Sequence, residues 1–262
     1  MNSNLRTSAS GMAAQQQMID VIANNLANVN TSSFKRSRAS FEDVLYQTVQ
    51  GGRALENPAG ETTGPMQIGS GVRLASVLRI HSQGVLQTTD RPFDLAIEGE
   101  GFLQVARPDG TTAYTRDGSL TLSESGTLMT SSGYPVVPEI LIPEDATDVT
   151  VSPAGVVTVT TSGNSSAIEV GRLELARFLN PCGLSAIGEN QFAETDASGQ
   201  PLLGFAQEDG FGRLTQGALE ASNVDVVQEM TDMIAAQRAY EINARAIQAG
   251  DQMLQAANDL IR

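Results

Sequence analysis

Near the N-terminus, apolar residues recur at alternating steps of four and three. The positions are Leu5, Ala9, Met12, Gln16, Ile19, Ala23 and Leu26, and all but Gln16 are apolar. This spacing continues over about three heptads and is typical of a coiled-coil seam. It predicts a helix over residues 4–28, which ends where NVNTSS offers side chains that compete for backbone hydrogen bonds.

The same spacing is longer at the C-terminal end. From Val226 it selects Met230, Met233, Gln237, Tyr240, Ala244, Ile247, Asp251, Leu254, Asn258 and Ile261, most of them apolar. SNVD at 222–225 is a weak capping box before this run. A helix of about 35 residues would be roughly 50 Å long, so it needs a partner along its length. The terminal helices could pair with each other, but about ten residues of the longer seam would then pack on other subunits or stay exposed.

Between the two ends the periodicity changes to two. Segments such as FDLAI, GFLQVA and VVTVTT alternate with turn signals such as PDG and SSGYP, which predicts an antiparallel β domain over residues 95–200. Residues 51–71 are rich in Gly, Pro and Thr with little periodicity, which is typical of an extended loop or a long irregular hairpin.

The pattern therefore predicts an α+β fold, with long N- and C-terminal helices pairing as a coiled coil and a central, mainly antiparallel β domain. The predicted segments are an N-terminal helix (1–30), a hinge and extended connector (31–94), the β domain (95–200), a return connector (201–222) and a C-terminal helix (223–262).

Composition narrows the possible partners. The chain has 30 acidic and 16 basic residues and a net charge of −14, which disfavours nucleic acid and anionic membranes. A single cysteine, Cys182, excludes an internal disulfide framework and a cysteine zinc site, and we expect an inert thiol. The N-terminal sequence lacks the apolar region of a secretory signal, so export would use another route.

Candidate chemistry is sparse, and we expect no catalytic residue, no cofactor site and no metal site. The lone histidine, His81, has no triad motif and is interpreted as structural. GLSAIG around Ser185 does not fit the nucleophile elbow, and Glu98 and Glu100 flank a glycine, which favours a solvated bend. The basic cluster FKRSR at 34–38 either meets the acidic surface of a neighbouring copy or is a solvated charge run.

Two long stretches resemble the signatures of the bacterial flagellar axial family, which includes rod and hook proteins. They are MIDVIANNLANVNTSSFKRSRASFEDVLYQ near the N-terminus and LEASNVDVVQEMTDMIAAQRAYEINARAIQAGDQML near the C-terminus. The central segment from HSQGVLQTTDRPFDLAIEGEGFLQV onward is also similar, so the resemblance covers nearly the whole chain and is greatest to the distal rod type. The signature positions are Asn24, Asn25, Leu26, Ala27, Asn28, Phe34, Lys35, Ser222, Asn223, Val224, Arg238, Tyr240 and Glu241.

The resemblance implies a structural protein and not an enzyme. Such subunits leave through the flagellar type III export apparatus without a cleaved signal peptide and polymerise helically into a hollow drive shaft, which crosses the periplasm to the outer membrane and carries torque from motor to hook. The implied partners are further copies, proximal rod proteins, the hook-side neighbour, and the peptidoglycan and outer-membrane ring bushing. Residues 51–71 correspond to an insertion that locks neighbouring subunits.

The expected coiled-coil and intersubunit packing residues are Leu5, Met12, Ile19, Leu26, Met230, Met233, Tyr240, Ile247 and Leu254. Three alternatives stay open: a hook or other rod protein of the same family, an adhesin-like stalk, and a cell-wall enzyme housed in the β domain. A conventional secretion signal would favour the stalk, and wall-degrading activity would favour the enzyme.

Overall fold

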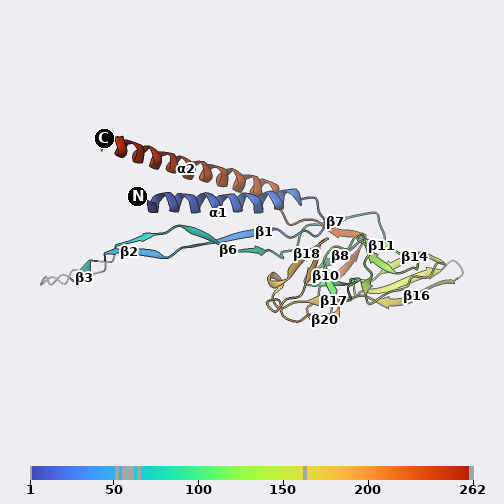
Figure 1. Ribbon diagram of the computed structural model, residues 1–262. Coiled ribbons are helices and arrows are strands. Elements are labelled where there is room, and N and C mark those ends of the chain that lie inside the picture. The colour runs from blue at the N-terminus through green and yellow to red at the C-terminus, as the bar shows by residue number, and fades with distance from the viewer. Residues whose placement is uncertain (1, 51–52, 55–61, 64–65, 162–163, 260–262) are drawn as a thin grey trace. The chain divides into compact units, whose positions relative to one another are not determined.

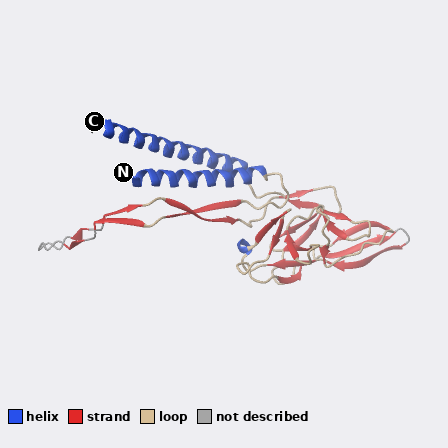
Figure 2. Ribbon diagram, in the orientation of Figure 1, coloured by secondary structure: helices blue, strands red, loops and turns tan. Residues whose placement is uncertain are grey.

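The computed structural model describes residues 2–50, 53–54, 62–63, 66–161 and 164–259. The fold is α+β, with a helix at each end of the chain and mainly antiparallel strands between them (Figure 2). The chain forms two compact units, each built from separate stretches of sequence. Unit 1 comprises Met1–Ala27, Ser37–Leu78 and Asp225–Arg262, and unit 2 comprises Asn28–Arg36 and Arg79–Val224.

Unit 1 contains both long helices, α1 (Asn2–Ala27) and α2 (Val226–Asp259). Asp225 caps α2, because its Oδ1 accepts hydrogen bonds from the backbone N–H of Val227 at 2.9 Å and of Gln228 at 3.3 Å. The sequence suggested Ser222 as the capping residue, but the Ser222 hydroxyl instead accepts a bond from Val224 N at 3.4 Å. The last residue of SNVD is therefore the cap.

The rest of unit 1 is a long antiparallel ribbon of strand pairs. β1 (Ser37–Asp43) pairs with β6 (Val72–Arg79), β2 (Tyr46–Gln50) with β5 (Met66–Gly69), and β3 (Arg53–Ala54) with β4 (Thr62–Thr63). The described part of 51–71 is thus a hairpin, one of the two forms that the sequence left open, while 51–52, 55–61 and 64–65 lie outside the described residues. Helix α1 contacts both α2 and β1 (Figure 1).

Unit 2 is built on an antiparallel sheet in the order β18-β19-β10-β9-β17-β20, with β13 also pairing with β9. Its strands are β9 (Phe102–Ala106), β10 (Thr112–Thr115), β13 (Val136–Val137), β17 (Glu174–Arg177), β18 (Ser185–Gly188), β19 (Gln191–Ala193) and β20 (Leu202–Phe205). A second sheet has three strands, β14 (Ala146–Val151), β15 (Val156–Thr161) and β16 (Asn164–Arg172).

Three further antiparallel pairs complete unit 2. They are β7 (Leu86–Thr88) with β22 (Ala218–Glu220), β8 (Leu95–Glu98) with β21 (Arg213–Gln216), and β11 (Leu120–Leu122) with β12 (Leu128–Thr130). Strands β20, β21 and β22 all lie within residues 201–222, where the sequence suggested a connector. The β structure therefore extends beyond 95–200, because these short strands lack a clear period of two but have partners from distant parts of the chain.

The core of unit 2 is aliphatic, with a separate aromatic cluster. Leu95, Ile97, Leu103 and Leu175 are at most 2% exposed and belong to one buried cluster. Close packing requires glycine at position 118, where an added Cβ would lie 1.6 Å from the carbonyl oxygen of Leu95. The aromatic cluster is formed by Phe102, Tyr114, Ala176, Phe178, Leu184 and Phe192.

Candidate functional site: assembly surfaces

The two helices of unit 1 pack against each other in antiparallel orientation. A Cβ added at Gly250 on α2 would lie 3.0 Å from Leu5 Cδ2 on α1. At the other end of α1, Asn25 Nδ2 donates a hydrogen bond to Glu229 Oε2 at 3.1 Å. The start of α1 therefore lies beside the end of α2, and the end of α1 lies beside the start of α2 (Figure 1). The supercoil expected from the heptad spacing stays a prediction.

The predicted packing residues divide between two environments. Leu5, Met12, Ile19, Leu26, Met233, Ile247 and Leu254 are half-buried in the helix pair. Met230 and Tyr240 are 51% and 39% exposed. The heptad spacing missed Ile22 and Ala236, which are buried. Helix α1 contacts β1 as well as α2, so its buried face is wider than a single seam.

Asn25 connects three segments of unit 1. Its Oδ1 accepts a hydrogen bond from Ser37 N at 2.9 Å, and its Nδ2 donates to Ser37 O at 2.8 Å as well as to Glu229. Asn25 and Glu229 are both 1% exposed. This signature asparagine therefore supplies hydrogen bonds that hold α1, the start of β1 and the first turn of α2 together.

Unit 1 also exposes large apolar side chains. Val227, Met230 and Ile234 follow steps of three and four on α2, so they form one strip, and all three are about half exposed or more. On the ribbon, Met66 and Ile68 lie on one face of β5 and are exposed, and Leu45 is 86% exposed. Clusters of exposed apolar residues on a soluble protein mark interaction surfaces. We call the first set the α2 strip and the second the ribbon patch.

Unit 2 contains a buried cluster of charged side chains. Lys35 Nζ lies 2.5 Å from Glu220 Oε1, and Arg116 Nε lies 2.9 Å from Glu220 Oε2. The Arg116 guanidinium also donates to the carbonyl oxygens of Gly101 and Gly99, at 3.1 and 2.9 Å. The charged side chains are at most 5% exposed. One carboxylate thus joins the segment before β1, the turn after β10 and the end of β22.

The cluster holds two cations and one anion, and this changes the proton affinities of its members. Burial lowers the pKa of Lys35, and Arg116 lowers it further, against the opposing effect of Glu220. For Glu220, burial raises the pKa, but Arg116 and Lys35 lower it by more, so its pKa is below the ordinary value. The carboxylate is therefore held ionised between two cations.

Signature residues around this cluster fix the same segment. Asn223 Oδ1 accepts a hydrogen bond from Arg36 N at 2.7 Å, while its Nδ2 donates to Ile80 O at 2.8 Å. Ser33 N donates to Glu220 O at 2.7 Å, and Ser33 has a positive φ of 58°. Signature positions Asn25, Lys35 and Asn223 therefore form internal hydrogen bonds.

The remaining signature positions are spread over both units. Val224 is buried, Leu26, Asn28, Phe34 and Ser222 are half-buried, and Asn24 and Ala27 are exposed. Arg238, Tyr240 and Glu241 are exposed on α2. The signature thus combines residues that hold the fold with residues at the surface of a helix.

The residues considered for catalysis have structural contacts. The His81 ring lies edge-on to Phe102 and Phe192, with centroids 5.8 and 5.5 Å away. Glu98 pairs with Arg213 at 2.7 Å, Cys182 is exposed and contacts Arg79 O at 3.3 Å, and Ser185 lies on an exposed strand. Within the described residues, no group of acidic, histidine and cysteine side chains could hold a metal ion, and no helix has the length and apolar character of a membrane span.

Sequence reasoning did not single out Arg116 or Glu220. The sequence pattern could have indicated that Glu220 is buried. A period of two places it on the same face of β22 as the buried Ala218. A carboxylate on a buried face requires cationic partners. Which cations they are cannot be predicted from spacing, since Lys35 and Arg116 are far from Glu220 in the sequence.

Family models match three parts of the chain. Residues 5–35 match the flagella basal body rod protein family, and residues 215–260 match the flagellar basal body rod FlgEFG protein C-terminal family. Residues 96–159 match the flagellar hook protein FlgE/F/G D1 domain. The first two matches cover most of α1 and α2, and the third lies in unit 2.

Curated relatives are similar over nearly their full length. The chain is 51% identical to the flagellar basal-body rod protein FlgG of Borreliella burgdorferi, with 98% of each chain covered. It is 50% identical to FlgG of Caulobacter vibrioides, again over 98% of each chain, and 39% identical to FlgG of Bacillus subtilis over 99% of each. This chain therefore belongs to the FlgG family of flagellar basal-body rod proteins.

Proposed function

We propose that this chain is a structural subunit of the distal part of the flagellar rod, polymerising helically into a hollow drive shaft that carries torque from motor to hook. The observation that carries the proposal is sequence identity. The chain is identical to basal-body rod proteins at about half of the aligned positions, over 98% of both chains. Similarity over both units means that the proposal applies to the whole chain and not to one domain.

The exposed apolar surfaces of unit 1 support assembly from many copies. The α2 strip and the ribbon patch expose large apolar side chains, and burying each of these side chains is worth roughly 1.5–3 kcal/mol. If different surfaces of neighbouring copies meet, the contact does not close on itself and produces a filament. Met230 and Tyr240, predicted as packing residues, are exposed and so available to another copy.

The neighbours of the shaft belong to the same proposal. We expect contacts with proximal rod proteins below, with the hook-side neighbour above and with the ring bushing around the rod, and delivery by the flagellar type III export apparatus. The rod would run from the periplasm to the outer membrane. The ribbon would lock neighbouring subunits, as the resemblance of 51–71 implies.

Complementation in a flagellated bacterium that lacks its own distal rod protein tests the proposal. We expect the chain to restore swimming and to be found, by immunogold labelling of purified hook–basal bodies, in the rod near the outer-membrane ring. Labelling of the hook instead would favour the alternative that the chain is a hook protein, which the rod relatives do not favour. Well-folded, exported chain that is absent from basal bodies would contradict the proposal.

A further inference from the structure

Three segments of unit 2 are tied together by two buried charged side chains. The segments are residues 33–36, 80–84 and 220–223. Lys35 Nζ donates hydrogen bonds to Glu220 Oε1 at 2.5 Å and to Ser82 O at 2.8 Å. Glu220 Oε1 also accepts a hydrogen bond from Gly84 N at 2.7 Å. Each segment is therefore bonded directly to the other two, and we call this set of contacts the junction network.

The amide side chain of Asn223 and the backbone add further bonds to the junction network. Asn223 Oδ1 accepts a hydrogen bond from Arg36 N at 2.7 Å, and its Nδ2 donates to Ile80 O at 2.8 Å. Ile80 N in turn donates to Arg36 O at 2.9 Å. A Cβ added at Gly84 would lie 2.0 Å from Ala221 O, so the backbones of two segments also approach each other closely.

These segments lie where the chain passes to and from unit 1. After its first entry, the chain leaves unit 2 after Arg36, enters it again at Arg79 and leaves it for the last time after Val224. Each of these three passages is at a bonded residue of the junction network or one residue away from it. A force that follows the backbone at these passages is therefore applied directly to the network.

The junction network has the properties of a stiff connection. A hinge is normally made of a few loop residues whose φ and ψ angles absorb the movement of the parts that they connect. Here both oxygens of the Glu220 carboxylate and both polar atoms of the Asn223 amide are bonded. A buried polar network whose members are satisfied makes a structure rigid. Movement of one segment would break its bonds to both of the others.

We propose, on the basis of the drive-shaft function above, that the junction network transmits force between the two units and prevents a hinge in these segments. Lys35, Glu220 and Asn223 are its positioning residues. Charge-assisted hydrogen bonds are stronger than neutral ones, which suits a contact under repeated load. The network lies wholly within unit 2, so its opening can be measured in the free chain before any assembly.

Lys35 allows a direct measurement, because it is the only lysine of the chain and its side chain is fully buried. An acetylating ester reacts with this amine only when the network opens, and peptide mass spectrometry separates the product from the acetylated N-terminus. Burial lowers the pKa of Lys35, which by itself would speed the reaction, so slow acetylation reports a closed network. We expect acetylation of the free full chain to be about a hundredfold or more slower than in urea.

Asn223→Ala tests the network without changing the charge around Lys35. It removes the bonds to Arg36 and Ile80 and leaves both hydrogen bonds of Lys35 Nζ in place. Acetylation of Lys35 should become about tenfold faster or more, because buried polar groups lose their partners. The matched control is Asn180→Ala, which removes an exposed bond to Ala197 O outside the network and should change the rate less than about twofold.

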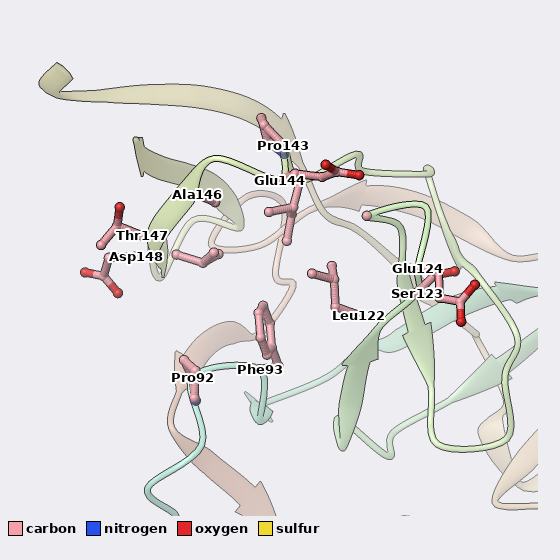
Figure 3. A pocket seen from close by; sticks show the side chains of 13 residues that line it. Pro92, Phe93, Leu122, Ser123, Glu124, Pro143, Glu144, Ala146, Thr147 and Asp148 are labelled. Atoms are coloured by element: carbon pink, nitrogen blue, oxygen red, sulfur yellow. The ribbon is translucent and has the colours of Figure 1, made fainter. Parts of the chain in front are cut away.

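Glu220→Gln tests the carboxylate, which bonds all three segments. Hydrogen exchange of residues 33–36 is the measurement here, because loss of the anion also changes the reactivity of Lys35 itself. Exchange should become faster than in Asn223→Ala, since charge-assisted bonds are lost. The control is Glu124→Gln, at the edge of an open hollow of unit 2 (Figure 3), where exchange of residues 33–36 should stay at the wild-type rate.

Complementation under load tests whether the network carries force. In a strain without its own distal rod protein, Asn223→Ala should form hook–basal bodies in normal number in dilute medium. In viscous medium, where the drag on the filament is greater, more of its basal bodies than of the wild type should lose the hook by breakage of the rod, as counted by electron microscopy. Asn180→Ala should break no more often than the wild type at either viscosity.

A second variant keeps the test valid if Asn223→Ala does not fold. Lys35→Met removes the bonds to Glu220 and Ser82 but leaves Glu220 paired with Arg116, so the remaining charges balance and the variant should fold. We expect the same breakage under load. Equal acetylation of Lys35 in Asn223→Ala and Asn180→Ala, or breakage that does not rise with viscosity, would overturn the junction assignment alone. Failure of the wild-type chain to complement would overturn the rod function and the force-transmitting role with it.

Discussion

In unit 2, Lys35, Arg116 and Glu220 are at most 5% exposed, and both cations pair with the one carboxylate. In unit 1, by contrast, Val227 and Ile234 on α2 are 75% and 49% exposed. A charged group at an interior position and an apolar group at the surface both depart from the usual distribution of residues. The buried charges of unit 2 have partners within the same chain. The exposed apolar side chains of unit 1 can be covered only by another molecule.

The difference between the two regions indicates a division of roles. Unit 2 has a buried aliphatic core, an aromatic cluster and internally paired charges, so its stability comes from its own contacts. The helix pair of unit 1 buries few side chains completely, and a long helix gains little stability from intrinsic propensity alone. We therefore expect unit 2 to be the stable part of a free subunit and the helix pair to gain much of its stability on assembly.

The largest effect on the stability of unit 2 should come from Glu220→Ala. Removing the carboxylate leaves Lys35 and Arg116 buried without their anion, which costs about 3–5 kcal/mol of unfolding free energy. Urea titration followed by hydrogen-exchange mass spectrometry would measure this loss in the strands of unit 2. The control is Glu98→Ala, which removes an exposed pair with Arg213 and should cost about 0–1 kcal/mol. Equal losses in the two variants would show that the buried cluster does not stabilise unit 2.

A smaller effect is expected from Asn25→Ala in unit 1. The substitution removes the hydrogen bonds to Ser37 and Glu229, and leaving buried polar groups without them costs about 1–3 kcal/mol. Faster amide exchange in α1, β1 and the first turn of α2, with unit 2 unchanged, is the expected result. Gln17→Ala at an exposed position of α1 is the control. Protection that stays at the wild-type level would contradict the role given to Asn25.

Acidification should weaken unit 2 through His81 by about 1–2 kcal/mol between pH 7 and pH 5. The pKa of His81 is lowered from 6.5 to about 4, first by burial and then by Lys35, Arg116 and Arg79, with Glu220 opposing them. The unfolded chain therefore takes up a proton on this ring at a higher pH than the folded chain does, and folded stability is lost as the pH falls below 6.5. Unit 2 of His81→Gln should lose less stability over the same range.

The pH window separates His81 from the carboxylates. The pKa of Glu220 is lowered overall by Arg116 and Lys35 despite its burial, so its contribution is lost only at lower pH than the window used. Chemical denaturation at pH 7 and pH 5 in the same salt measures both proteins. An identical loss of stability in wild type and variant would remove His81 as the cause.

Sequence periodicity predicted the elements better than their contacts. The steps of four and three gave helices over 4–28 and 223–262, close to the observed α1 and α2, because a helix repeats a local pattern. The period of two gave a β region but missed β20, β21 and β22, whose few residues carry too little pattern. Partners such as Glu220 and Lys35 could not be predicted, since spacing in the sequence says nothing about which distant segments meet.

The heptad pattern also did not say which apolar residues the chain itself buries. Met233 and Met230 both lie on the predicted seam, yet the first is half-buried and the second is exposed. A helix with partners on two sides carries apolar residues for both, and periodicity cannot separate the intramolecular partner from an external one.

The smallest effect on the free chain, and a large one on assembly, should come from Ile234→Ser in the α2 strip. Ile234 is 49% exposed, so its replacement should change the unfolding free energy of the monomer by at most about 0.5 kcal/mol. If another copy covers it, the lost burial of roughly 1.5–3 kcal/mol per contact raises the critical concentration for tubes about tenfold or more. Negative-stain electron microscopy over a concentration series measures this shift.

Ile234→Val, which keeps most of the apolar surface, and Ala235→Ser at the neighbouring exposed position should both assemble near the wild-type concentration. Normal assembly of Ile234→Ser would show that the α2 strip is not an interface, and the surface that drives polymerisation would then have to be sought on the ribbon patch.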